Sequence, residues 1–124
     1  MANKTINVTE AELAVLDALW EEGAVTIRQI TDKLYEEGTT SEYATVQKLL
    51  DRLQVKGCVK RSKRSHAHKF SAKVSRSELI GSGLETLAEK LCSGSLTPLL
   101  MHLTENTKLS QQDRDKLREL IDQA

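Results

Sequence analysis

Four short polar motifs mark where helices of this chain begin. In each motif a Ser or Thr is followed three residues later by Glu or Gln, so that each side chain can cap the other residue's backbone amide. The four pairs are Thr9 with Glu12, Thr26 with Gln29, Thr39 with Glu42, and Ser75 with Glu78. They predict helices over residues 10–22, 27–37 and 40–56 and a fourth from residue 76, with glycine-containing turns between the first three.

The third predicted helix is amphipathic. Val46, Leu49, Leu50 and Leu53 recur at a spacing that places them on one buried stripe. The opposite face carries small and polar side chains, which suit a helix that enters the major groove of DNA. The residues predicted to contact DNA from this helix are Thr40, Ser41, Tyr43, Ala44, Thr45, Gln47, Lys48 and Arg52.

A basic segment follows this helix. Between Arg52 and Ser77 there are nine Lys or Arg and no Asp or Glu, although the whole chain has a formal net charge of zero. The pattern predicts a strand over residues 58–61, a turn over 62–66 and a return strand over 67–71. A helix followed by a basic hairpin is the winged helix-turn-helix arrangement, with Lys63, Arg64 and His66 of the wing predicted to contact DNA. The alternative is a solvated charged surface, but the neighbouring polar helix favours DNA.

The segment after Ser75 is rich in leucine and predicts three more helices: one from residue 76, one over about 96–103, and one that opens with Ser110. The predicted fold is therefore mostly α with a small β-hairpin, with a winged-helix DNA-binding domain at 1–74 and a helical dimerisation domain at 75–124. Gly81 and Gly83 weaken the first of these helices and suggest a hinge. The predicted dimer interface consists of Leu84, Leu87, Leu91, Leu96, Leu99, Leu100, Leu103, Leu117, Leu120 and Ile121. The alternative is that these helices fold back onto the winged domain; dimerisation is favoured because operator-binding proteins of this size usually need two half-sites.

Composition excludes several other classes. Aromatic residues make up only 3% of the chain, too few for a platform that stacks single-stranded nucleic acid. No apolar signal segment or membrane-spanning run is present, so a soluble cytoplasmic protein without membrane insertion is expected. Cys58 and Cys92 are predicted to be reduced packing residues. Cys58, His66 and His68 are the candidate metal ligands, but they are scattered without a tight ligand pattern, so neither a metal nor a cofactor is predicted. No catalytic motif is recognised, and an enzyme is not expected.

Two stretches resemble the penicillinase repressor family (BlaI, MecI and CopY type) of bacterial winged-helix repressors. The first is Thr9-x-x-Glu12 leading to Leu19-Trp20. The second and more specific stretch is Tyr43-Ala44-Thr45-Val46-Gln47-x-Leu49-Leu50-x-Arg52-Leu53-x-x-Lys56-Gly57, followed by the basic hairpin that ends at Phe70. The resemblance runs from Thr9 to Ile121.

This resemblance implies a homodimer that binds a palindromic double-stranded DNA operator and blocks transcription. Copper-responsive members carry C-terminal Cys-x-Cys pairs, which are not found in residues 121–124, so copper sensing is disfavoured. Antibiotic-responsive members are cut by a signal-activated protease between Asn and Phe, where this chain has His102-Leu103. We therefore expect release of the operator by cleavage between Leu100 and Thr104 by a protease of altered specificity, with small-ligand binding in the dimer groove as the alternative. The competing function is a winged-helix protein-interaction module without specific DNA binding, which salt-sensitive binding to random DNA would argue against.

Overall fold

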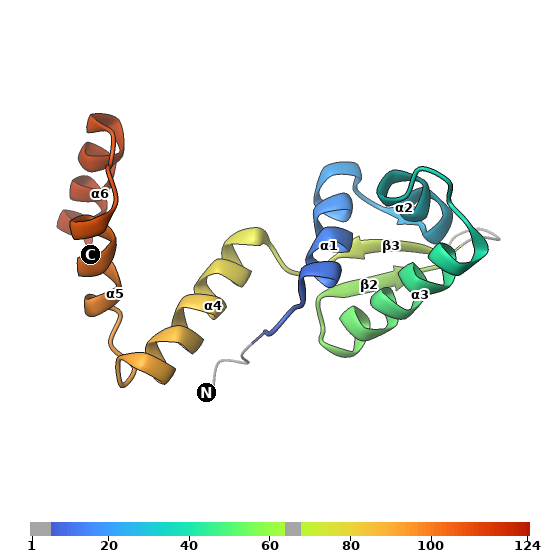
Figure 1. The fold of residues 1–124 in the computed structure, drawn as a ribbon, viewed down its shortest axis with the longest axis horizontal. Coiled ribbons are helices and arrows are strands. Elements are labelled where there is room, and N and C mark those ends of the chain that lie inside the picture. The colour runs from blue at the N-terminus through green and yellow to red at the C-terminus, as the bar shows by residue number, and fades with distance from the viewer. Residues whose placement is uncertain (1–5, 64–67) are drawn as a thin grey trace. The chain divides into compact units, whose positions relative to one another are not determined.

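The computed structural model describes residues 6–63 and 68–124 and divides the chain into two compact units, Met1–Gly83 and Leu84–Ala124. Its described helices are α1 (Glu10–Glu22), α2 (Ile27–Leu34), α3 (Thr40–Val55), α4 (Arg76–Leu91), α5 (Thr97–Asn106) and α6 (Gln111–Gln123). Its described strands are β1 (Val25–Thr26), β2 (Val59–Ser62) and β3 (Lys69–Ala72). This confirms the predicted class, mostly helical with a small antiparallel sheet (Figure 1).

All four predicted capping boxes are formed, and each sets the start of its helix. At α1, the Thr9 amide donates to Glu12 Oε1 at 2.8 Å, and the Glu12 amide donates to Thr9 Oγ1 at 3.2 Å. The same reciprocal pair of bonds opens α2, α3 and α4. These contacts satisfy amides that the first turn of a helix leaves without an intrahelical partner.

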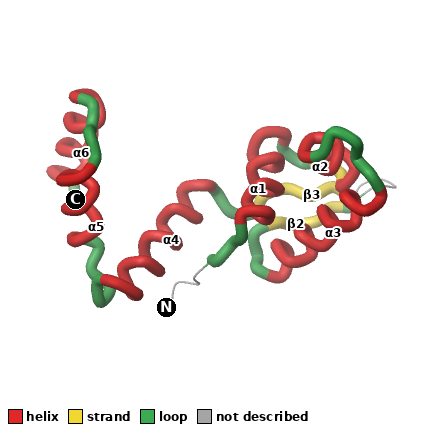
Figure 2. The backbone as a smooth tube through the Cα atoms, in the orientation of Figure 1, coloured by secondary structure: helices red, strands yellow, loops and turns green. Residues whose placement is uncertain are grey.

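The sheet has one strand more than the predicted hairpin. Strand β3 pairs antiparallel with both β2 and β1, giving the order β1-β3-β2. Strands β2 and β3 lie side by side in Figure 2. In β1, Val25 faces Phe70 and Thr26 faces Lys69. The sequence did not reveal β1, because it is two residues long and Thr26 also caps α2.

Several boundaries differ from those predicted. Helix α2 ends at Leu34 rather than Glu37, because Tyr35 is already extended and Gly38 turns with φ +56°. The hairpin strands begin and end one or two residues later than expected, and α5 continues to Asn106. The predicted turn lies mostly in residues 64–67, outside the described residues.

The core of the first unit lies between α1, α2, α3 and the sheet (Figure 1). Leu16, Leu50 and Leu53 are fully buried there, as the helical spacing predicted for the stripe of α3. Leu79 of α4 also packs against this core, and Trp20 Nε1 donates to the Val74 carbonyl at 2.9 Å. The first turns of α4 are therefore anchored to the first unit.

The second unit contains the end of α4, together with α5 and α6. Helix α4 continues through Gly81 and Gly83, so the two glycines do not break it; a hinge there stays a prediction. The contact division falls between Gly83 and Leu84, while the functional boundary between residues 74 and 75 also stays a prediction. Among the described residues of this unit, Ala88 is the only buried apolar side chain.

Candidate nucleic-acid interface

Helix α3 presents most of the predicted DNA-contacting residues to solvent. Its apolar stripe is buried in the core, and the residues on its opposite side are exposed. Exposed on that side are Thr40, Ser41, Ala44, Thr45, Gln47, Lys48 and Arg52, whereas Tyr43 is half-buried. The structure thus brings these residues together on one helix, and their contact with DNA stays a prediction.

Capping chemistry occupies part of the turn that leads into α3. The Thr39 amide donates to Glu42 Oε1 at 2.9 Å and the Glu42 amide donates to Thr39 Oγ1 at 3.2 Å. The Thr45 hydroxyl donates to the Ser41 carbonyl at 3.0 Å, so its oxygen retains acceptor capacity. The backbone amides of Thr39 and Glu42 are therefore already hydrogen-bonded and are not free to bind a phosphate oxygen.

The wing carries exposed cations beside α3. Lys60, Arg61, Lys63, Lys69 and Lys73 are exposed. In the described part of the chain none of these five has an ion-pair partner. Their charge is thus available to phosphates. Arg64 and His66, which were also predicted to contact DNA, lie outside the described residues.

An ion pair between the buried Glu12 and Lys56 was not predicted from the sequence. Glu12, read as a capping residue, is fully buried, and Lys56 Nζ lies 2.6 Å from its Oε1 and 2.7 Å from the Asn7 carbonyl oxygen. Burial raises the pKa of Glu12, but hydrogen bonds from Lys56 and Thr9, with the Lys56 charge, lower it below the ordinary value. The pair ties the end of α3 to the start of α1. The sequence signalled Lys56 only through its place, with Gly57, at the end of the family signature.

The two cysteines are candidate disulfide or metal-binding residues. Both cysteines are free, as predicted, with Cys58 buried and Cys92 half-buried. Burial raises the pKa of the Cys58 thiol, and the nearby Lys56 charge opposes that rise. Among residues 6–63 and 68–124 no group of three potential metal ligands is assembled. The same residues contain no helix long and apolar enough to cross a membrane.

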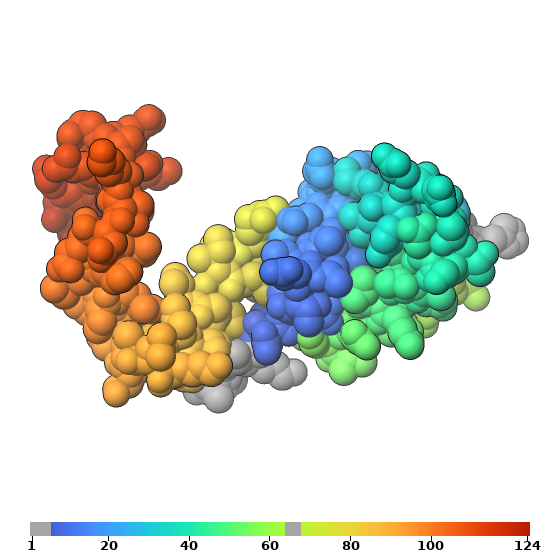
Figure 3. All heavy atoms as spheres, in the orientation of Figure 1, coloured from blue at the N-terminus to red at the C-terminus, as the bar shows by residue number. Residues whose placement is uncertain are grey.

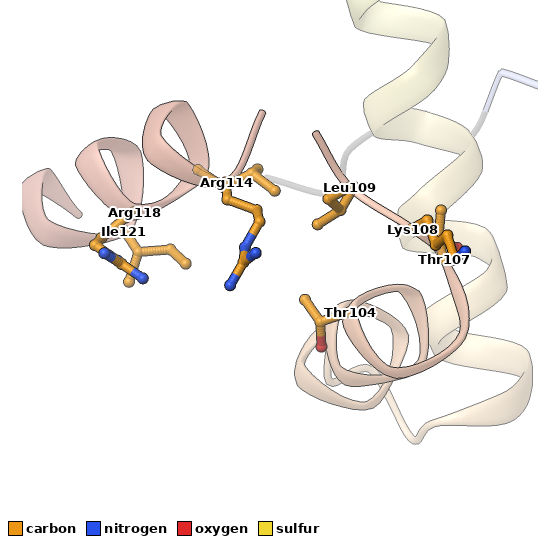
Figure 4. A pocket seen from close by; sticks show the side chains of 8 residues that line it. Thr104, Thr107, Lys108, Leu109, Arg114, Arg118 and Ile121 are labelled. Atoms are coloured by element: carbon orange, nitrogen blue, oxygen red, sulfur yellow. The ribbon is translucent and has the colours of Figure 1, made fainter. Parts of the chain in front are cut away.

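The second unit exposes most of the predicted dimer interface. Nine of its ten residues are exposed, for example Leu91 at 74% and Ile121 at 67%, while Leu99 is half-buried. Between α5 and α6 lies an open cavity of about 620 Å³, into which Arg114 and Arg118 of α6 reach from the side opposite Thr104 of α5 (Figure 4). Leu117 and Ile121 also line it. The cavity is therefore lined by both apolar and cationic side chains.

The predicted cleavage position lies within α5. His102 and Leu103 are exposed, and the Asn106 side-chain amide donates to the His102 carbonyl at 3.0 Å. Proteases generally act on extended chain, so this bond would become accessible only after local unwinding of α5. Cleavage here stays a prediction.

Comparison with known proteins gives a consistent result over the length of the chain. The profile of the penicillinase repressor family matches residues 8–123. The penicillinase repressor of Staphylococcus aureus is 24% identical over 121 residues, which cover 98% of this chain and 95% of that protein. The methicillin resistance regulatory protein MecI of Mammaliicoccus sciuri is 24% identical over 121 residues, covering 98% of each chain.

A solved structure has a similar fold. The solution structure of the DNA binding domain of the repressor BlaI aligns with a TM-score of 0.51 at 23% identity, covering 62% of this chain and 93% of that domain. At this identity the match shows a shared fold. With the family match over residues 8–123, the predicted resemblance is confirmed, and the chain belongs to the penicillinase repressor family of transcriptional regulators, which are not enzymes.

Proposed function

We propose that this protein is a homodimeric transcriptional repressor that reads a palindromic operator with α3 and holds its backbone with the wing. The observation that carries the proposal is the pairing of the small, polar, exposed face of α3 with neighbouring wing cations that lack acidic partners in the described chain. Small polar groups can approach base edges, while unpaired cations bind phosphates. Family membership supports the same function.

The base-reading role belongs to the middle of α3. Gln47 and Lys48 are exposed there, about two turns beyond the capped end. Gln47→Ala and Lys48→Ala should each weaken binding to the preferred site by about 1 to 3 kcal/mol, the range for loss of a good base contact. Binding to random duplex at low salt should change little. The preferred site is first selected from a random DNA pool, and affinities are then measured by fluorescence anisotropy.

Replacing Asp51 gives a matched control, because it lies on the same helix and is exposed but is not in the predicted contact set. Asp51→Ala should leave the site preference unchanged. An unaltered preference in both Gln47→Ala and Lys48→Ala would remove α3 from base recognition.

The wing is proposed to bind phosphate or the minor groove rather than major-groove bases. Lys63 is exposed, and Arg64 is its neighbour in the chain. Replacing both with Ala should weaken binding to all sequences together, and the slope of log affinity against log salt should shrink by about one per lost contact. An unchanged slope would place the hairpin away from DNA.

Dimerisation is proposed to reside in the helices after Ser75. The exposed leucines of α5 and α6 and the apolar residues lining their cavity would be covered by a second copy. An apolar surface of this kind is uncommon on a monomer, because its hydration is unfavourable. The second copy would also bring a second α3 to the other half-site.

Release is proposed to follow cleavage between Leu100 and Thr104. A cut there would separate α6, with Leu117, Leu120 and Ile121, from the rest of the chain. The tethering of two half-sites would then be lost without any change in the DNA-contacting residues. Intact-mass spectrometry of the protein from induced cells tests this. Full-length chain that has left its operator would contradict proteolysis and favour a ligand in the dimer groove.

A further inference from the structure

Arg28 of α2 contacts three different parts of the surface around the predicted recognition helix. Its Nη1 donates to the Gly38 carbonyl at 3.0 Å and lies 3.4 Å from Asp32 Oδ1. Its Cζ lies 5.1 Å from the centroid of the Tyr43 ring, within the range of a cation–π interaction. One guanidinium thus joins α2, the turn after it and the first turns of α3, which form a continuous stretch of surface (Figure 3).

The turn between α2 and α3 is built to allow this contact. Gly38 adopts φ +56°, a conformation that favours glycine. A Cβ at this position would lie 2.8 Å from Asp32 Oδ1 and 3.3 Å from Arg28 Nη1. The absence of a side chain at Gly38 therefore lets the carboxylate and the guanidinium pack against the turn.

We propose that Arg28 is a positioning residue for DNA recognition, an inference that rests on the proposed function of α3. Tyr43 lies in the first turns of α3, beside Ala44 and one turn before Gln47. By holding the Tyr43 ring and the Gly38 carbonyl at once, Arg28 fixes the start of α3 against α2. Base contacts require placement within a fraction of an ångström, so a small shift of this turn lowers base discrimination.

The role suits arginine and not lysine. A planar guanidinium can stack on a ring and donate in its own plane at the same time, which an ammonium group cannot do. The three contacts are solvent-exposed, with the Arg28 side chain 49% exposed, so each adds little to folding stability. Because the guanidinium is already engaged with a ring, a carbonyl and a carboxylate, its role differs from that of an unpaired phosphate-binding cation.

The test compares Arg28→Ala and Arg28→Lys in the full-length protein. Affinity is measured by fluorescence anisotropy for the selected site and for a scrambled duplex, over a range of salt concentrations. Both variants should lower the ratio of specific to nonspecific affinity by about threefold to tenfold, the scale expected for one lost contact. The salt slope of nonspecific binding should stay that of the wild type, because no phosphate contact is lost.

Arg76→Ala is the matched control. Arg76 also stacks on an aromatic ring, with Cζ 4.7 Å from the Trp20 centroid, and pairs with Asp17 at 2.6 Å. Its substitution removes the same charge together with a ring contact and a carboxylate contact, but from α1 and the start of α4 rather than from α3. The affinity ratio of Arg76→Ala should equal that of the wild type, and circular dichroism melts confirm that all variants are folded.

Three results would overturn the inference. The first is an unchanged ratio of specific to nonspecific affinity in Arg28→Ala. The second is a wild-type affinity ratio in Arg28→Lys together with a reduced salt slope in Arg28→Ala, and the third is an equal fall of the affinity ratio in Arg76→Ala. The second result would make Arg28 a phosphate contact. Gln47→Ala distinguishes a failure of the Arg28 role from a failure of base reading by α3. If Gln47→Ala alters site preference and the Arg28 variants do not, only the role of Arg28 fails; if no variant alters it, base reading by α3 fails as well.

Discussion

The two units of this protein use their apolar side chains in opposite ways. In the described chain, fourteen of the fifteen buried apolar residues belong to Met1–Gly83, and ten of the twelve exposed large apolar residues belong to Leu84–Ala124. The first unit thus closes its own core around α1, α3 and the sheet. The second places leucines on three helices and covers almost none of them.

The difference indicates which unit can be stable alone. Removing apolar surface from water contributes about 25 cal/mol per Å² to stability, and only the first unit achieves that burial internally. The second unit leaves its apolar side chains exposed, and we propose that a second copy of the chain covers them. In this proposal the first unit makes the contacts with DNA, and the C-terminal unit joins two copies so that both half-sites are bound together.

The largest expected effect comes from disrupting the proposed dimer. Leu117→Asp combined with Ile121→Asp places charges on the exposed apolar side of α6. Sedimentation should show a monomer, and operator affinity should fall by a factor of about 10² to 10⁴, because the second half-site is no longer tethered. Gln112→Asp, which lies half a helical rotation from Ile121, is the control and should remain a dimer.

A fragment ending at Gly83 sharpens the same test. It should be a folded monomer that binds a half-site weakly, since the core and the anchored first turns of α4 are retained. Dimerisation of this fragment, or of the double Asp variant, would move the interface into the winged unit.

The next effect contrasts one leucine from each unit. Leu50→Ala should destabilise the first unit by about 2 to 5 kcal/mol, because it leaves a cavity in a close-packed core. Leu120→Ala makes the same chemical change at a side chain that is 55% exposed, and it should shift the unfolding of the first unit by less than about 0.5 kcal/mol. Urea unfolding followed by the fluorescence of Trp20, the single tryptophan, reports on this unit. Equal effects would show that the two units do not differ in the way described.

A smaller effect should follow from the buried ion pair. Lys56→Met leaves the buried Glu12 carboxylate without its charged partner and should cost about 2 to 3 kcal/mol near neutral pH. Lys33→Met is the control, because Lys33 pairs with the exposed carboxylates of Glu21 and Glu22, and such a pair contributes about 0 to 1 kcal/mol.

The Lys56→Met effect should depend on pH. In the wild type the pKa of Glu12 is lowered from 4.5, so its ionised form stabilises the fold above that pH, and the stabilisation is lost as pH falls through the folded-state pKa. Without Lys56, burial raises the pKa, and the protonated acid is tolerated in the core. The stability difference between wild type and variant should therefore shrink as pH is lowered from 7 toward 4. A constant difference would contradict the pairing.

Much of the first unit was predictable from sequence because its signals are local. The capping boxes of Thr9, Thr26, Thr39 and Ser75 each join residues three positions apart, and all four set a helix start as expected. The buried stripe of α3 likewise followed from residues within two turns. The family signature from Tyr43 to Gly57 also indicated the winged-helix fold.

What only the tertiary structure decided depends on residues that are far apart in the chain. The pairing of β1 with β3 places Val25 opposite Phe70, and the two residues of β1 carry no periodicity by which to recognise a strand. The pairing of Glu12 with Lys56 spans 44 residues, so the capping motif revealed one hydrogen bond of Glu12 and not its burial. The contacts of Arg28 and Asp32 with the Gly38 turn, after the early end of α2, likewise appear only in the folded chain. Neighbouring residues determine a helix start, because their side chains reach the same few amides, whereas burial and strand pairing depend on which distant segments the folded chain brings together.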